Sequence, residues 1–265
     1  MDFHVHLPFD WEKRGVSPKE ATRRVLEWMD GNGVDVAVLL PIAPYISNDY
    51  VAEVVECEPV RLVGFASVVP NPADVAAEEL KRAVRELGLK GVKLHPSMQG
   101  FCLRNPHVWR VLREAGILGV PVLIDAMLGD FSTLYFKAGL LSLNTVEDYS
   151  LLPVVAPSTT LILAHMGGLY RFREIMEVAT AANVYLDVSY SLVTIAGELG
   201  PAKLAKYFRV LGTEKFLFGS DTVIGATPEE YGVRAHLRVL EDMELSPGER
   251  EAILHANARK LLKLS

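Results

Sequence analysis

Two histidines lie two residues apart in the apolar stretch that opens the chain, Asp2-Phe-His-Val-His6. In a β-strand, residues i and i+2 point to the same face, so His4 and His6 would present their imidazoles side by side. Imidazole nitrogen is a common ligand of zinc and similar divalent ions. The pair alone fits either half of a metal site or two hydrogen-bonded histidines of an ordinary strand.

Similar polar groups lie at the ends of other apolar stretches that we expect to be strands. They are Lys93, His95, Asp125, His165 and Asp221. In barrels of alternating strands and helices, the carboxyl ends of the strands meet at one face, which carries the active site. Imidazoles, carboxylates and a lysine meeting there favour a metal centre over a purely structural role. The histidines at 107, 236 and 255 lie in expected helices or their approaches and are interpreted as ordinary.

The elements that must position these groups alternate along the chain. Almost continuous apolar stretches, typical of buried parallel strands, are separated by helical patterns. The strands are expected to end near His6, Ile42, Val69, His95, Asp125, His165, Ser189 and Asp221. Eight such units in about 250 residues predict an α/β fold, a single (β/α)8 or TIM barrel over residues 1–265. A doubly wound open sheet is the alternative, but no Gly-x-Gly-x-x-Gly follows the first strand.

Two further features qualify this pattern. A long interval at about 126–158 separates strands five and six. It could form a lid or substrate wall or, equally, a dimerisation arm. A short helix is expected within it, over 145–152. A last helix is expected from Ser246-Pro247 to Leu262, covering the lower rim with Ile253, Leu261 and Leu262 buried.

Composition restricts the partners. The formal net charge is −6 and no cluster of Lys and Arg is visible, so nucleic acid is not expected. The longest uncharged stretch, 151–170, contains Pro153 and Pro157 and does not resemble a membrane span. Two cysteines and no leader-like segment favour a cytoplasmic protein. We expect a small-molecule substrate, and whether the chain forms a homo-oligomer is left open.

Several segments together resemble the amidohydrolase superfamily, and more narrowly the amidohydrolase-related branch that includes aminocarboxymuconate-semialdehyde decarboxylase and small-molecule hydrolases. They are Asp2-Phe-His-Val-His6, Gly91-Val-Lys-Leu-His-Pro96, Pro121-Val-Leu-Ile124, His165-Met-Gly-Gly168, Phe218-Gly-Ser-Asp221 and Asn257-Ala-Arg-Lys-Leu-Leu262. The resemblance implies a metal-dependent barrel enzyme in which His4, His6 and Asp221 bind a divalent ion, usually zinc. It makes His165 either a ligand or a catalytic acid or base.

The fifth strand departs from that resemblance. Members of the branch commonly have Pro-Val-Leu-Ile-His there, with the histidine as a ligand, whereas this chain ends the phrase with Asp125. A carboxylate can still bind the ion and would favour harder ions such as manganese somewhat more. Alternatively, the Asp125 side chain turns away from the ion and leaves a site that lacks one ligand or is inactive.

Lys93 and His95 also leave alternatives open. Lys93 could pair with Asp125, hold a substrate carboxylate, or carry a carbamate that bridges two metal ions, as the resemblance allows. His95 follows Lys93 by two residues in the same expected strand, so its side chain should point to the same face. It would then line the same pocket as a substrate-binding group, or else fix the loop at Pro96.

These residues support three hypotheses. The preferred one is a metal-dependent hydrolase that cleaves an amide, ester or lactone bond of a small polar molecule. In it, a metal-bound water would lose its proton to Asp221. His165 would orient the electrophile or stabilise the developing oxyanion. The second is a decarboxylase of an aromatic or dienoic acid, in which His165 helps to protonate carbon. The third is a non-catalytic barrel. Asp221→Asn is expected to abolish activity and leave metal-free stability unchanged or higher, because Asp125 should repel the Asp221 carboxylate.

Overall fold

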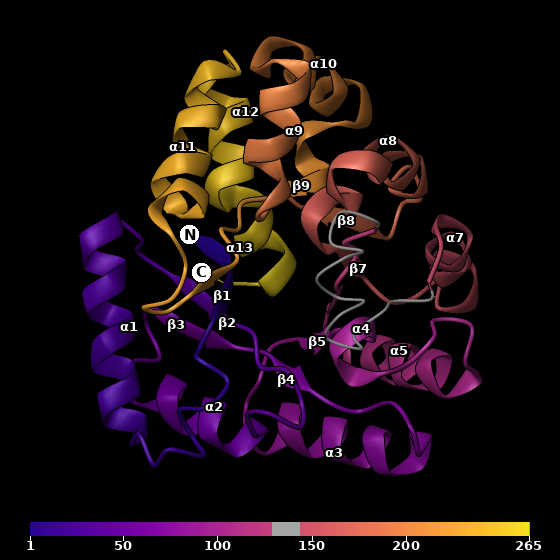
Figure 1. Ribbon diagram of the computed structural model, residues 1–265. Coiled ribbons are helices and arrows are strands. Elements are labelled where there is room, and N and C mark those ends of the chain that lie inside the picture. The colour runs from indigo at the N-terminus through magenta and orange to yellow at the C-terminus, as the bar shows by residue number, and fades with distance from the viewer. Residues whose placement is uncertain (129–143, 265) are drawn as a thin grey trace.

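The structure is a computed structural model that describes residues 1–128 and 144–264. Short parallel strands form a ring, and helices surround it (Figure 1). The strands are β1 (Asp2–His6), β2 (Ala37–Leu39), β3 (Leu62–Gly64), β4 (Ala66–Ser67), β5 (Val92–Leu94), β6 (Val122–Ile124), β7 (Leu161–Leu163), β8 (Val184–Asp187), β9 (Phe216–Leu217) and β10 (Thr222–Val223).

The ring is a (β/α)8 barrel, as the sequence predicts. Hydrogen-bonded neighbours follow the orders β10-β1-β2-β3 and β4-β5-β6-β7-β8-β9. Only Phe65 separates β3 from β4, so these two form the third barrel strand, and β9 and β10 together form the eighth. Because β10 pairs with β1 in parallel, the last strand closes onto the first.

The helices cover the outside of this ring (Figure 1). They are α1 (Pro18–Asn32), α2 (Asn48–Glu56), α3 (Ala73–Arg85), α4 (Pro96–Gln99), α5 (Pro106–Leu118), α7 (Val146–Val155), α8 (Gly168–Val178), α9 (Ser191–Leu199), α10 (Pro201–Leu211), α11 (Val233–Asp242), α12 (Pro247–Glu251) and α13 (Asn257–Leu262). Short turns of other helix types include η1 (Ala164–Gly167) and η4 (Ala252–Ala256). Among the described residues, no helix is both long enough and apolar enough to span a membrane.

Capping explains where several helices begin. The Ser17 hydroxyl accepts a hydrogen bond from the Glu20 backbone N–H, and Pro18 occupies the first turn of α1. Ser246 and Glu249 cap each other's backbone N–H groups at the start of α12. The chain then stays helical through η4 to Leu262, so the predicted last helix contains one π-type turn.

The apolar core has two parts. A large cluster lies between strands and helices, and a smaller one includes Phe3, Phe65, Leu123 and Ile162 from the barrel strands. Ala258 and Leu262 of α13 join the smaller cluster, which agrees with a last helix that closes one end of the barrel. Leu261 is only half-buried, against expectation, because successive helix residues rotate by about 100° and Leu262 takes the inward direction.

A register shift at β1 matters for the site. Asp2 pairs with Ala37 and Val5 with Leu39, so β1 advances three residues while β2 advances two. The extra residue allows Phe3 to enter the inner cluster while His4 and His6 still face the same pocket. Within the interval 126–158 expected to form a lid or dimerisation arm, residues 129–143 lie outside the described residues, and the short helix expected over 145–152 is α7.

Candidate metal centre and active site

His4 and His6 turn the same nitrogen inward. Their Nε2 atoms lie 3.1 Å apart. The Nδ1 of His4 is 2.5 Å from Asp187 Oδ2, and the Nδ1 of His6 is 2.6 Å from the carbonyl oxygen of Leu40. The Leu40 carbonyl carries no hydrogen, and Asp187 Oδ2 carries none in its carboxylate form, so each Nδ1 donates and each Nε2 keeps a lone pair that points into the pocket.

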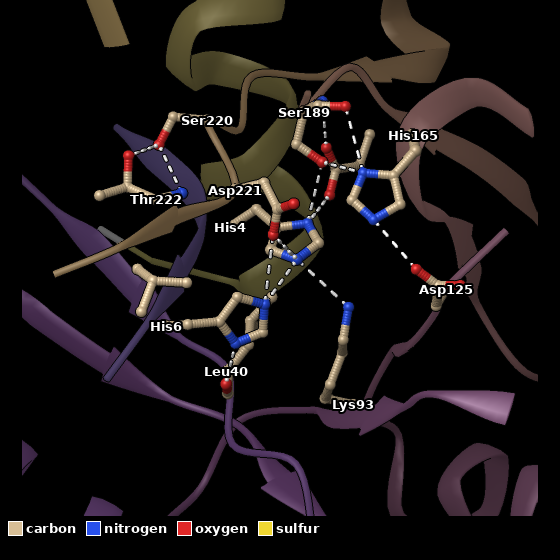
Figure 2. A network of polar contacts seen from close by, with 12 residues as sticks. His4, His6, Leu40, Lys93, Asp125, His165, Ser189, Ser220, Asp221 and Thr222 are labelled. Carbon is tan, nitrogen blue, oxygen red and sulfur yellow. Dashed lines mark hydrogen bonds and ion pairs between the residues drawn. The ribbon is translucent and has the colours of Figure 1, made fainter. Parts of the chain in front are cut away.

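Asp221 completes a set of three donors. Its Oδ1 lies 3.2 Å from His4 Nε2 and 3.3 Å from His6 Nε2 (Figure 2). These atoms all lie within 4.8 Å of one another, as one coordination sphere requires. Two imidazole lone pairs and a carboxylate oxygen would repel one another unless a positive group lay between them. The residues therefore fit a divalent ion with two nitrogen ligands and one oxygen ligand.

Lys93 lies beside this set and directs its amino group at His4 (Figure 2). It comes from β5, is almost completely buried, and places Nζ 3.2 Å from His4 Nε2. Burial lowers the pKa of Lys93. Burial and the charge of Lys93 in turn hold the pKa of His4 well below its ordinary value, which keeps His4 in the neutral form that binds metals. No ion pair joins Lys93 to Asp125 among the described residues.

Asp125 and His165 form a separate pair. His165 Nε2 lies 3.1 Å from Asp125 Oδ2, and His165 Nδ1 lies 3.2 Å from the carbonyl oxygen of Ser189. Both oxygens accept hydrogen bonds, so His165 fits best as an imidazolium that donates from both nitrogens. Burial alone would lower its pKa, but the hydrogen bond to Asp125 and the charge of Asp221 raise it to about 9.

His95 lies on the other side of Asp125. Its Nε2 is 3.6 Å from Asp125 Oδ2, and its Nδ1 accepts a hydrogen bond from the backbone N–H of Met98 at 3.4 Å. Burial lowers the pKa of His95 to about 4, so the ring is neutral and its remaining proton lies on Nε2. His95 thus both caps α4 and lines the pocket, which combines the two alternatives considered from the sequence.

These groups share one cavity of about 200 Å³. Its walls combine polar and apolar side chains: His6, Phe9, Ile42, Lys93, His95, Met98, Asp125, Met127, His165, Tyr190, Asp221 and Val223. Ordinary ligand pockets have volumes of about 300–1,000 Å³, so this cavity suits a compact molecule. Three of the lining residues have unusual positive φ angles: His165 (63°), Tyr190 (56°) and Asp221 (59°). Such strain in non-glycine residues is typical of functional sites.

The predicted site residues therefore fall into two groups. His4, His6 and Asp221 form the three-ligand set, with Lys93 beside it. Asp125 and His165 pair with each other, and neither belongs to that set among the described residues. Whether either one reaches a bound ion stays a prediction.

Sequence reasoning predicted a strand ending near Ser189 but gave no role to the polar residues at its end. Asp187 and Ser189 are buried there, and both contact the site histidines. The sequence did indicate a possible role here, because Asp187 is an acidic residue inside an expected buried strand. Tyr149 of α7 was also missed; its hydroxyl donates to the backbone oxygen of Asp125 at 2.6 Å. A single tyrosine in the short helix expected over 145–152 gives no comparable signal.

Comparisons with known proteins agree with this geometry. The sequence profile of the amidohydrolase family matches residues 1–264. The chain is 33% identical over 85 residues to 2-amino-3-carboxymuconate-6-semialdehyde decarboxylase of Dictyostelium discoideum; the match covers 32% of this chain and 23% of that protein. The matched part is thus under a quarter of the relative's length.

Two solved structures share the whole fold. A 2,6-dihydroxybenzoate decarboxylase in complex with 2,6-dihydroxybenzoate aligns with a TM-score of 0.71 and 20% identity, over 100% of this chain and 98% of the other. A dihydroxybenzoic acid decarboxylase of Polaromonas sp. JS666, with bound manganese and 2-nitroresorcinol, aligns with a TM-score of 0.69 and 21% identity, over 100% and 98%. The match of the family profile to almost every residue shows that the chain belongs to the amidohydrolase family.

Proposed function

We propose that this protein is a metal-dependent decarboxylase of a small aromatic or dienoic acid. The observation that carries the proposal is the arrangement of His165, which keeps a proton on Nε2 in the same cavity as the three-ligand set. Decarboxylation needs an acid that protonates carbon, whereas hydrolysis by a metal-bound water first needs a base. The names of the similar proteins support the same choice over hydrolysis.

In the proposed reaction, the substrate carboxylate lies at the set formed by His4, His6 and Asp221. A divalent ion held there, manganese or zinc, would bind that carboxylate and draw electron density from it. The bond between the carboxylate carbon and its neighbour breaks, carbon dioxide leaves, and the electron pair stays on the neighbouring carbon. His165 transfers its Nε2 proton away from Asp125 to that carbon and becomes neutral, while the bond from Nδ1 to the Ser189 carbonyl holds the ring.

The remaining wall residues would select the substrate. Lys93 lies beside the ligand set and is placed to offset a second negative charge on the substrate. Phe9, Met98 and Met127 give the cavity apolar surfaces against which a planar ring or a diene can pack. His95 directs its Nε2 proton toward the same space and is placed to donate to a polar substituent.

The test is a substrate screen with the metal-loaded chain. Hydroxybenzoic and dienoic acids are incubated with the manganese-loaded and the zinc-loaded protein, and released carbon dioxide is measured. In D2O the product should carry one deuterium at the carbon that lost its carboxylate. His165→Gln should lower turnover by about 100- to 10,000-fold. The same exchange at exposed His107 is the control and should have no effect.

Two results would reject the proposal. Hydrolysis of esters, amides or lactones without carbon dioxide release would restore the hydrolase interpretation. Failure of the chain to bind manganese or zinc would favour a non-catalytic barrel.

A further inference from the structure

The carboxyl end of β8 connects the two groups of site residues. Asp187 Oδ2 lies 2.5 Å from His4 Nδ1, and Ser189 Oγ lies 3.0 Å from both His4 Nδ1 and His165 Nδ1. Both Asp187 and Ser189 are fully buried. A carboxylate without contact with water is costly unless its hydrogen bonds are well formed, so this arrangement needs a compensating role.

The orientation of Asp187 is fixed from the other side. Its Oδ1 accepts the backbone N–H of Ser189 at 2.6 Å, which leaves Oδ2 directed at His4. The backbone between β9 and β10 also approaches this pair closely. A Cβ atom at Gly219 would lie 2.7 Å from His4 Cβ and 2.9 Å from Asp187 Oδ1, so only glycine fits beside the pair without a shift.

We propose that Asp187 is a positioning residue that holds the His4 proton on Nδ1 and thereby keeps the Nε2 lone pair free for the ion. This inference rests on the proposed function only in taking a metal ion as the ligand of His4. His6 reaches the same tautomer through the Leu40 carbonyl, which no side-chain substitution removes. The His4 tautomer, in contrast, depends on side chains: the Ser189 hydroxyl can donate or accept, so the Asp187 carboxylate is the group that requires Nδ1 to donate. Carboxylates behind metal-binding histidines change metal affinity by about 10- to 100-fold.

Asp187→Asn makes a specific prediction. An asparagine that still accepts the Ser189 N–H must use its carbonyl oxygen for that bond, so its NH2 group faces His4 Nδ1. The NH2 group donates, and Nδ1 must then accept. The His4 proton moves to Nε2 and occupies the position of the metal-binding lone pair. An amide placed behind a catalytic histidine produces the wrong tautomer in the same way.

The experiment combines two measurements on the full chain. Nitrogen-15 NMR of metal-free, histidine-labelled protein reports which nitrogen of His4 carries the proton, with signals assigned by their loss in His4→Gln. Titration calorimetry with manganese(II) chloride reports affinity. We expect the Nδ1–H tautomer in the wild-type chain, the Nε2–H tautomer in Asp187→Asn, and affinity reduced by 10- to 100-fold or more in that variant.

Two control variants separate this role from general destabilisation. Ser189→Ala keeps Asp187 and should keep the Nδ1–H tautomer. Asp148→Asn makes the same exchange at a buried aspartate that caps α7 and pairs with Arg104, and it should lower stability without changing manganese affinity.

The outcomes distinguish the inference from the proposed function. If Asp187→Asn leaves both the tautomer and the affinity unchanged, the inference is wrong. If that variant fails to fold, the wild-type spectrum still decides, because an Nε2–H tautomer of His4 would overturn the inference. If the wild-type chain binds no metal, the proposed function fails, while the two spectra continue to test the role of Asp187.

Discussion

At the scale of single residues, Asp221 has surroundings that the sequence did not reveal. The Asp221 carboxylate was expected to lie against Asp125, but Asp125 pairs with His165. Burial would raise the pKa of Asp221, yet the neighbouring imidazoles, of which His165 carries a positive charge, hold it well below its usual range. The expectation that removing its charge leaves metal-free stability unchanged or raises it depended on repulsion by Asp125, whereas the structure places the charged His165 among the groups that act on Asp221.

We accordingly expect Asp221→Asn to impair both function and metal-free stability. Asparagine tolerates the positive φ of 59° at this position, so the backbone should not change. Turnover should fall by at least about 100-fold with loss of a ligand, and the melting temperature of the metal-free chain should drop because contacts to a charged group are lost. The exposed Asp242→Asn is the control. A metal-free melting temperature equal to or above wild type would show that the charged His165 does not stabilise this carboxylate.

At the scale of elements, one side chain connects three loops around the pocket. Gln99, at the end of α4, donates from Nε2 to the carbonyl oxygens of Ala43 and Val68 at 3.2 and 3.0 Å. Its Oε1 accepts the backbone N–H of His95 at 2.7 Å. The loops that follow β2, β4 and β5 are thereby held together behind two of the pocket walls, formed by Ile42 and His95.

Gln99→Glu should loosen these loops. A glutamate of the same shape accepts but does not donate, so the Ala43 and Val68 carbonyls lose their partner and face a negative charge. We expect the free energy of unfolding to fall by about 1–3 kcal/mol and KM to rise more than kcat falls. Urea unfolding at neutral pH measures the loss. Unfolding near pH 4, where protonation restores one donor, should recover part of it, and a loss independent of pH would contradict this explanation.

At the scale of the whole molecule, the proposed metal site lies on the seam where the barrel closes. His4 and His6 belong to the first strand, while Asp221 lies between β9 and β10 of the last. The same seam contains hydrogen bonds from the Phe3 N–H to the Phe218 carbonyl at 2.8 Å and from the Ser220 N–H to Asp2 Oδ1 at 3.0 Å. A bound ion would therefore connect the two ends of the barrel sheet.

Metal binding should consequently stabilise the entire barrel. At a free manganese concentration about a hundred times the dissociation constant, the free energy of unfolding rises by about 2.7 kcal/mol. For a chain of this size we expect the melting temperature to rise by roughly 5–10 °C. Thermal unfolding with EDTA and with manganese measures the shift. His4→Gln should lose it and His107→Gln should keep it; an equal shift in His4→Gln would place the ion elsewhere.

The sequence by itself determined the fold and the identity of most polar groups in the pocket. Eight apolar stretches alternating with helices allow few arrangements other than a closed parallel barrel, as the structure confirms. The spacing of His4 and His6 determined their common direction, because the period of a strand is local. The strand-end positions of Lys93, Asp125, His165 and Asp221 likewise placed them at one face of the barrel.

Only the tertiary structure decided how these groups pair. Asp125 could have joined the ligand set or turned away, and its pairing with His165 depends on the distance between two strand ends that no sequence spacing encodes. Asp187 approaches His4 across 183 positions of the chain. The protonation of each imidazole depends on which acceptor lies behind it and on how far water is excluded, and both are properties of the packed barrel.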